Sequence, residues 1–165
     1  MNVPCRKDCY ANKGTSKFPN VQHAWEQNYI MATNHRELYF NQISEFFKKS
    51  KTKVFRWHVS GDILDQNYLL SMISITNLYR DIKFLAFTKM YHLDFTTAPS
   101  NLQIVFSAWP NFPIISTPGI RIAWMQDGTE TRIPQNSMDC PGSCTTCKAC
   151  WNLKSLERDV VFHKH

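Results

Sequence analysis

Apolar residues recur at helical spacing between residues 19 and 50. Asn20, which follows Pro19, is predicted to be the N-cap of a first helix. Asn34 and Glu37 form a capping-box pattern, which predicts a second helix from that point. The apolar faces contain Val21, Ala24, Trp25, Tyr29 and Ala32 in the first helix, and Tyr39, Ile43, Phe46 and Phe47 in the second. Two helices in series are therefore expected.

Alternation of apolar and polar residues over 53–60 predicts a strand, with Phe55, Trp57 and Val59 on one side. A helix is predicted from near Asp65, with an apolar face that contains Leu69, Met72, Ile73 and Tyr79. The apolar run 84–87 follows this helix directly. A strand–helix–strand unit implies parallel pairing, because the crossover returns the chain to the same edge of the sheet.

Two further short strands are predicted at 103–107 and 121–124, and the terminal run Val160–Phe162 is a candidate for another. The link between 87 and 103 is short and rich in Thr and Pro, which interrupts a complete barrel pattern. Residues 126–155 are polar, Cys-rich and irregular. The expected fold is a single α/β domain over 1–165, with a partial (β/α) barrel-like, mostly parallel sheet, flanking helices and a Cys-rich C-terminal loop.

Length and composition agree with one folded domain, since 165 residues can bury a core without disulfides. The sequence contains no apolar run long enough for a membrane span and no signal-peptide pattern, so a cytoplasmic location without membrane attachment is expected. In that compartment thiols stay reduced. The six cysteines therefore point to metal or redox chemistry.

The cysteines form two compact groups, Cys5 with Cys9 and a C-x3-C-x2-C-x2-C run of Cys140, Cys144, Cys147 and Cys150. The second group contains the C-x2-C-x2-C spacing of ferredoxin-type clusters, which can take a fourth ligand from a distant part of the chain. A four-iron four-sulfur cluster that joins the two ends of the chain is the prediction. Zinc is the alternative, because four thiolates also satisfy a tetrahedral site. Which four of the six cysteines are ligands stays open.

Charge changes this picture little. The formal net charge is +6, from 19 Lys and Arg against 13 Asp and Glu, and the basic residues are scattered along the sequence. The only dense run is Lys48, Lys49, Lys51 and Lys53, which a solvated helix end explains. A zinc-stabilised module that binds nucleic acid through this run is the alternative function.

Polar residues follow several predicted strands. The carboxyl ends of parallel strands meet at one rim, where binding groups gather. His58 is a candidate acid or base, or a structural histidine. Asp62 is expected to cap the following helix, and Lys89 is a candidate anion contact or a solvated side chain. The predicted rim pocket contains His58, Ser60, Asp62, Thr88, Lys89 and Trp124, with Ser107, Trp109 and Asp127 near the same rim.

Three stretches, Cys5–Gly14, His58–Asp62 and Ile120–Trp124, resemble the phage gene product 88 family. The resemblance covers nearly the whole sequence, and it includes the late cysteine run and the final Val160–Phe162. It implies a viral protein in the host cytoplasm, with an undefined partner that is either a nucleic acid or a host protein.

The same family is similar to radical SAM enzymes, in which a C-x3-C-x2-C loop holds a cluster with one iron open to S-adenosylmethionine. Cys5 and Cys9 match this loop, but Asn12 stands where the third cysteine would be. Ser60–Asp62 is similar to the glycine-rich strand end that contacts the cofactor's amino group. The resemblance thus leaves two functions, an iron–sulfur protein with a structural, redox or regulatory role and a radical enzyme with unidentified catalytic residues.

Overall fold

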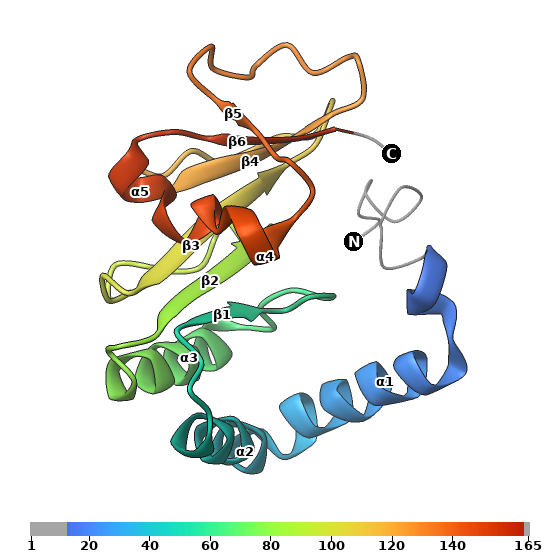
Figure 1. Cartoon of the computed structure of the whole chain (residues 1–165), viewed down its shortest axis with the longest axis vertical. Coiled ribbons are helices and arrows are strands. Elements are labelled where there is room, and N and C mark those ends of the chain that lie inside the picture. Colours follow the sequence, from blue (N-terminus) through green and yellow to red (C-terminus); the bar gives the residue numbers. More distant parts are fainter. Residues whose placement is uncertain (1–12, 164–165) are drawn as a thin grey trace.

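The centre of the fold is a six-stranded sheet in which every neighbouring pair of strands is parallel, in the order β1-β2-β3-β4-β6-β5. The computed structural model describes residues 13–163. The sheet curls into half of a barrel (Figure 1), which confirms the expected fold class. Its strands are β1 (Val54–Trp57), β2 (Lys83–Thr88), β3 (Leu102–Ala108), β4 (Arg121–Gln126), β5 (Met138–Asp139) and β6 (Val160–His163).

The two predicted helices in series are present, but both predicted caps are wrong. After the 3-10 turn η3 (Gly14–Lys17), α1 (Pro19–Asn34) begins at Pro19, whose fixed φ and missing N–H suit a first helical position. Asn34 cannot cap the second helix, because it is the last residue of α1. Instead α2 (Arg36–Lys49) has His35 at its N-cap, without a side-chain capping bond.

The strand–helix–strand unit is confirmed. Helix α3 (Gln66–Leu78) connects β1 to β2, and the two strands pair in parallel with Val54 opposite Lys83. The N-cap of α3 is Asp65, whose carboxylate accepts a hydrogen bond from the Tyr68 backbone N–H at 2.7 Å. Asp62, the predicted cap, makes contacts elsewhere. Thus the position of the helix is as expected and its capping residue is not.

Helices α2 and α3 pack on one face of the sheet and build an aromatic core there (Figure 1). The ring of Phe84 on β2 is fully buried and lies 5.5 Å from that of Phe47 on α2 and 6.0 Å from that of Trp57 on β1, between centroids. Tyr68 and Leu69 of α3 are buried in the same cluster. The predicted alternation is therefore confirmed for Phe55 and Trp57, which both face this core, but it is wrong for Val59, because β1 ends at Trp57 and Val59 is exposed.

The opposite face of the sheet is covered by the C-terminal segment, which forms α4 (Cys144–Cys147), the 3-10 helix η4 (Ala149–Asn152) and α5 (Leu153–Leu156). Leu153 is fully buried on this face against Leu85 and Val105. In a complete (β/α) barrel the helices lie outside and the other face lines the interior. The Cys-rich segment thus occupies the face that corresponds to a barrel interior.

Hydrogen bonds to three strands hold this segment in place. The Trp151 indole Nε1 donates to the Phe55 carbonyl at 3.0 Å, the Lys83 ammonium donates to Asn152 Oδ1 at 2.7 Å, and the Lys154 N–H donates to Gln103 Oε1 at 3.0 Å. The expectation that residues 126–155 are irregular is therefore wrong for their second half. Within residues 13–163, no helix has the length and apolar character needed to cross a membrane.

Candidate metal centre

The four late cysteines are placed by the turns between β5 and α5. Cys140 directly follows β5, and its N–H extends the ladder by donating to the Val161 carbonyl at 2.8 Å. The next two residues, Pro141 and Gly142, turn the chain back, and Gly142 has a φ of +79° that suits a residue without Cβ. Consequently the chain returns past Cys140 as the short helix α4.

Cys144 and Cys147 are the first and last residues of α4, and a spacing of three places them on the same side of one helical turn. Lys148 has a left-handed conformation with a φ of +51°, which ends α4 and redirects the chain into η4. Cys150 lies in η4. The chain thus bends twice in eleven residues, so that four thiols surround a common space.

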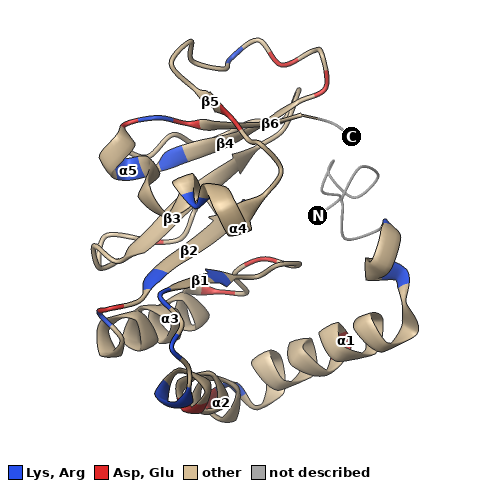
Figure 2. Ribbon diagram, viewed as in Figure 1, with Lys and Arg blue, Asp and Glu red and all other residues tan. Residues whose placement is uncertain are grey.

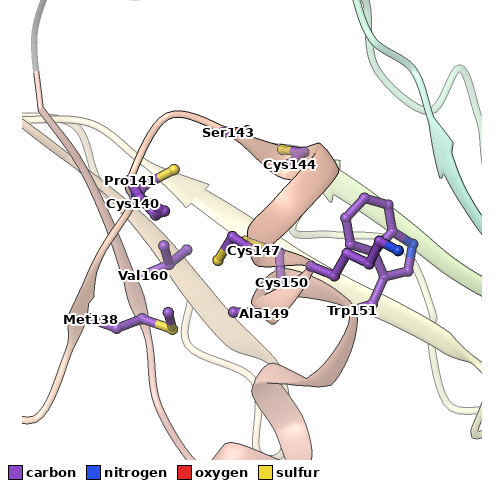
Figure 3. Close-up of a pocket in the computed structure, with 11 residues that line it drawn as sticks. Met138, Cys140, Pro141, Ser143, Cys144, Cys147, Ala149, Cys150, Trp151 and Val160 are labelled. Atoms are coloured by element: carbon purple, nitrogen blue, oxygen red, sulfur yellow. The ribbon is translucent and has the colours of Figure 1, made fainter.

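These four thiols line one pocket, whose apolar walls include Met138, Val160 and Trp151. Figure 3 shows the sulfur atoms of Cys140, Cys144 and Cys147 directed into the space between the loop after β5 and α4. All four thiols are free. Within residues 13–163 no three His, Cys, Asp or Glu side chains are already arranged to hold a metal ion, so the thiols are neighbours rather than a closed coordination sphere.

The electrostatics of the pocket disfavour uncompensated thiolates. Burial, and then the neighbouring Cys140, Cys144 and Cys147, raise the pKa of Cys150 to about 12, while Arg56 acts in the opposite direction. Arg56 projects from β1 on the face opposite to Trp57, and its guanidinium lies 4.9 Å from the centroid of the Phe87 ring. A cation beside crowded sulfurs favours a negatively charged occupant of this pocket.

The sequence pointed to the cysteines but not to Arg56. The usable signal was the alternation along β1, which places Arg56 on the face away from Phe55 and Trp57. Alternation alone does not show that the C-terminal segment covers this face and brings the cysteines beside Arg56. Cys5 and Cys9 lie outside the described residues, so the predicted junction of the two chain ends stays a prediction.

Part of the predicted rim is brought together around Asp62. Its Oδ1 accepts hydrogen bonds from the Thr88 hydroxyl at 2.6 Å and from the Ile63 N–H at 2.7 Å, and its Oδ2 accepts from the Lys89 N–H at 2.8 Å. Asp62 therefore ties the loop after β1 to the end of β2, which replaces the predicted role as a helix cap. Lys89 contributes its backbone to this contact, and Ser60 lies half-buried two residues before Asp62.

His58 directly follows β1 and has a strained backbone conformation with a φ of +52°. Its Nε2 is 3.0 Å from the Tyr68 hydroxyl, and among the described residues its buried Nδ1 has no hydrogen-bond partner. Burial lowers the pKa of His58 to about 4, against an opposing effect of Asp62, while Arg56 reinforces the shift. His58 is thus a neutral, half-buried histidine at neutral pH.

Trp124 belongs to a different set of contacts from the Asp62 group. It is buried, and its Nε1 donates to Asp159 Oδ2 at 2.9 Å, while Asp159 Oδ1 accepts from the Ile122 N–H at 3.0 Å. The Arg132 guanidinium lies 5.5 Å from the Trp124 ring centroid and pairs with the buried Glu130 carboxylate. These contacts fasten β4 to the residue before β6 and to the loop that follows β4. The spacing of these residues in the sequence does not predict their contacts.

The fold and the pocket together define a class of protein, a half-barrel whose interior face is closed by its own Cys-rich segment. A family model described as gene product 88 matches residues 2–152, which is most of the chain. The protein belongs to the gene product 88 family, as the resemblance of its sequence predicts. No curated protein and no solved structure matches the chain significantly.

Proposed function

We propose that this phage-family protein is an iron–sulfur protein that binds a four-iron four-sulfur cluster through Cys140, Cys144, Cys147 and Cys150. The observation that carries the proposal is that these four free thiols line one pocket. Four cysteine thiolates are the ordinary ligand set of such a cluster, and three of these cysteines have the C-x2-C-x2-C spacing found in ferredoxins.

The donor set and its surroundings fit a cluster. Apolar side chains flank the sulfurs on the side of the sheet, where Cys140 and Cys150 are half-buried, while Cys144 and Cys147 are exposed to solvent. A cluster with four thiolates carries net negative charge, and the cations of Arg56 and Lys148 lie beside the pocket. Burial and the neighbouring cysteines raise the pKa of the Cys150 thiol, so a bound metal, which favours the thiolate, would offset the cost of ionising it there.

The role that follows is structural, redox or regulatory. Four protein ligands would leave no iron open, so this ligand set argues against radical chemistry with S-adenosylmethionine. The cluster would fix the segment that closes the half-barrel. The host cytoplasm, which keeps thiols reduced, is the expected site of assembly.

Anaerobic purification with assays of iron and acid-labile sulfide tests the proposal directly. About four irons and four sulfides per chain, with a broad absorption band at the violet edge of the visible range, are expected. Single Cys→Ser changes at positions 140, 144, 147 and 150 should each reduce the iron content. The double change Cys5→Ser and Cys9→Ser is the matched control, and it should leave the iron content intact.

Three results would contradict the proposal. Stoichiometric zinc without sulfide would identify the zinc alternative, since four thiolates bind zinc equally well. Loss of the cluster in the Cys5 and Cys9 double variant, with retention in a late-cysteine variant, would mean that the ligands come from both ends of the chain. Electron paramagnetic resonance of the reduced protein, with and without S-adenosylmethionine, completes the test, because a spectral change on addition would reveal an open iron.

A further inference from the structure

The basic residues that look scattered in the sequence gather at one edge of the fold. Figure 2 shows Lys and Arg at the end of α2, at the starts of β1 and β2, and in and after α5. All of these elements meet the edge where the strands begin, opposite the rim of Asp62. We define the basic edge as the exposed side chains of Lys51, Lys53, Arg80, Lys83, Lys154 and Arg158.

Backbone and side-chain contacts link the segments that carry Lys53, Lys83, Lys154 and Arg158. The Lys83 N–H donates to the Lys53 carbonyl at 2.9 Å. Lys53, directly before β1, therefore lies beside Lys83, the first residue of β2. The Lys83 ammonium reaches Asn152 Oδ1 at 2.7 Å, two residues before Lys154. The Arg158 N–H then donates to the Leu153 carbonyl at 3.3 Å. A chain of direct contacts therefore connects β1 to the segment that precedes β6.

The cations outnumber the carboxylates along this edge. The exposed acidic residues interspersed with them are Asp81 and Glu157. Asp159 also lies near Arg158, but its carboxylate is buried against Trp124. Lys48 at the end of α2 pairs with Glu45 at 2.6 Å and is left out of the basic edge for that reason. The basic edge therefore carries a net positive charge.

Helix dipoles explain only part of this charge. Arg80 lies just after the carboxyl end of α3 and Lys154 lies in the last turn of α5, where cations compensate the negative end of the helix. Lys53 and Lys83 instead flank or begin strands, and Arg158 lies in the connection to β6. No dipole requires cations at those positions, and their shared placement favours an anionic ligand.

We propose that the basic edge binds the phosphate backbone of a nucleic acid. Neighbouring strands are about 4.8 Å apart, so the edge from β1 to β6 extends over about 19 Å. One strand of B-DNA carries about six phosphates over that length, since its phosphates follow every 3.4 Å of the helix axis. Six cations anchored at strand starts and short turns match this regular array of charges. The inference does not depend on the metal centre.

The test is the salt dependence of binding to fluorescent 20-mers of single-stranded DNA, RNA and duplex DNA, with the full chain as purified. Lys53→Gln with Lys154→Gln removes two phosphate contacts, so the slope of log affinity against log salt should fall by about 1.5 to 2. Affinity at low salt should fall about tenfold or more. Lys53→Arg with Lys154→Arg keeps the charge and should bind like the wild type.

The matched control is Lys13→Gln with Lys17→Gln, which removes the same charge at the start of the described chain. This control should retain the wild-type slope. The proposal is overturned if the wild type binds none of the three nucleic acids at low salt, or if both Gln double variants weaken binding equally. It is also overturned if polyglutamate or vesicles of anionic lipid compete as well as nucleic acid at equal charge, because the edge would then be a general polyanion surface.

Discussion

The two faces of the sheet are built from very different amounts of apolar surface. On the side of α2 and α3, sixteen buried residues form one cluster with many aromatic rings in contact. On the side of α4 and α5, five buried residues form the other cluster, and they are mostly Leu and Val. The helical face can therefore support its own packing, whereas the cysteine face has little core of its own.

This difference gives the four cysteines a physical role. A short segment with few buried apolar side chains gains too little from burial to offset the entropy lost on ordering. Metal ligation is a common way for such small units to supply the missing free energy. We therefore expect the helical face to be stable without metal and the cysteine face to depend on it.

Metal removal should have the largest effect and should separate the two faces. After treatment with a chelator under reducing conditions, residues 140–157 should lose hydrogen-exchange protection, while α3 and β2 keep theirs. Structural metal sites contribute on the order of 10 kcal/mol in zinc-finger peptides, so the loss should be complete rather than partial. Hydrogen exchange with mass spectrometry measures both regions in one experiment. Simultaneous loss of protection in α3 would show that the two faces unfold together.

Phe84→Ala tests the helical face. Phe84 is fully buried among Phe47, Phe55 and Trp57, so its truncation should lower the free energy of unfolding by about 3 to 5 kcal/mol. Phe87→Ala on the opposite face is the control. Phe87 is only half-buried, against Phe162 and Arg56, and its truncation should cost clearly less. Urea denaturation of the metal-loaded protein compares the two, and equal losses would contradict the difference between the faces.

The sequence predicted the helical face well because its signals are local. Alternation of apolar and polar residues predicted β1, and helical spacing of apolar residues predicted α3. The short connections between β1, α3 and β2 predicted that the two strands pair in parallel. The caps were less predictable, since Asn34 fits a capping pattern but ends α1, and the cap of α3 is Asp65 rather than the predicted Asp62. The two-residue strand β5 was missed, because it depends on pairing with β6 rather than on its own pattern.

The cysteine face was less predictable for the same reason. The residue types indicated a metal site, but the position of the site depends on contacts across long stretches of chain. Trp151 bonds to a carbonyl 96 residues away, and Lys154 to a side chain 51 residues away. The basic edge is a similar case, because Lys53 and Lys83 become neighbours only through the pairing of β1 with β2, and Arg158 reaches the same edge only because β6 joins the sheet. No local window contains such information.

His58 gives a pH-dependent probe of the helical face. Its pKa is about 4 in the folded protein and near 6.5 when unfolded, so the unfolded chain binds the proton more readily. This group's contribution is therefore fully present above pH 6.5 and is lost as pH falls toward 4, by about 3 kcal/mol. The charged and titratable groups around His58 are Arg56, Asp62 and Tyr68.

His58→Gln should remove that contribution, so the variant should lose about 3 kcal/mol less than the wild type between pH 7 and pH 4. Urea denaturation across this range measures the difference. Comparison of the variant with the wild type at each pH removes the effect of thiol titration, which is the same in both proteins. His23→Gln on the exposed part of α1 is the control and should follow the wild type. Parallel curves for His58→Gln and the wild type would mean that His58 is protonated as easily in the fold as outside it.

Trp151→Phe should have the smallest effect, because it removes one hydrogen bond between the cysteine face and β1 and keeps most of the apolar contact. Loss of the 3.0 Å bond to the Phe55 carbonyl should cost about 1 kcal/mol. If the cysteine face unfolds separately, this cost should appear in the exchange of residues 140–157 and leave α3 unchanged. A uniform change throughout the sheet would instead indicate that Trp151 couples the two faces, and the half-barrel would then be one cooperative unit.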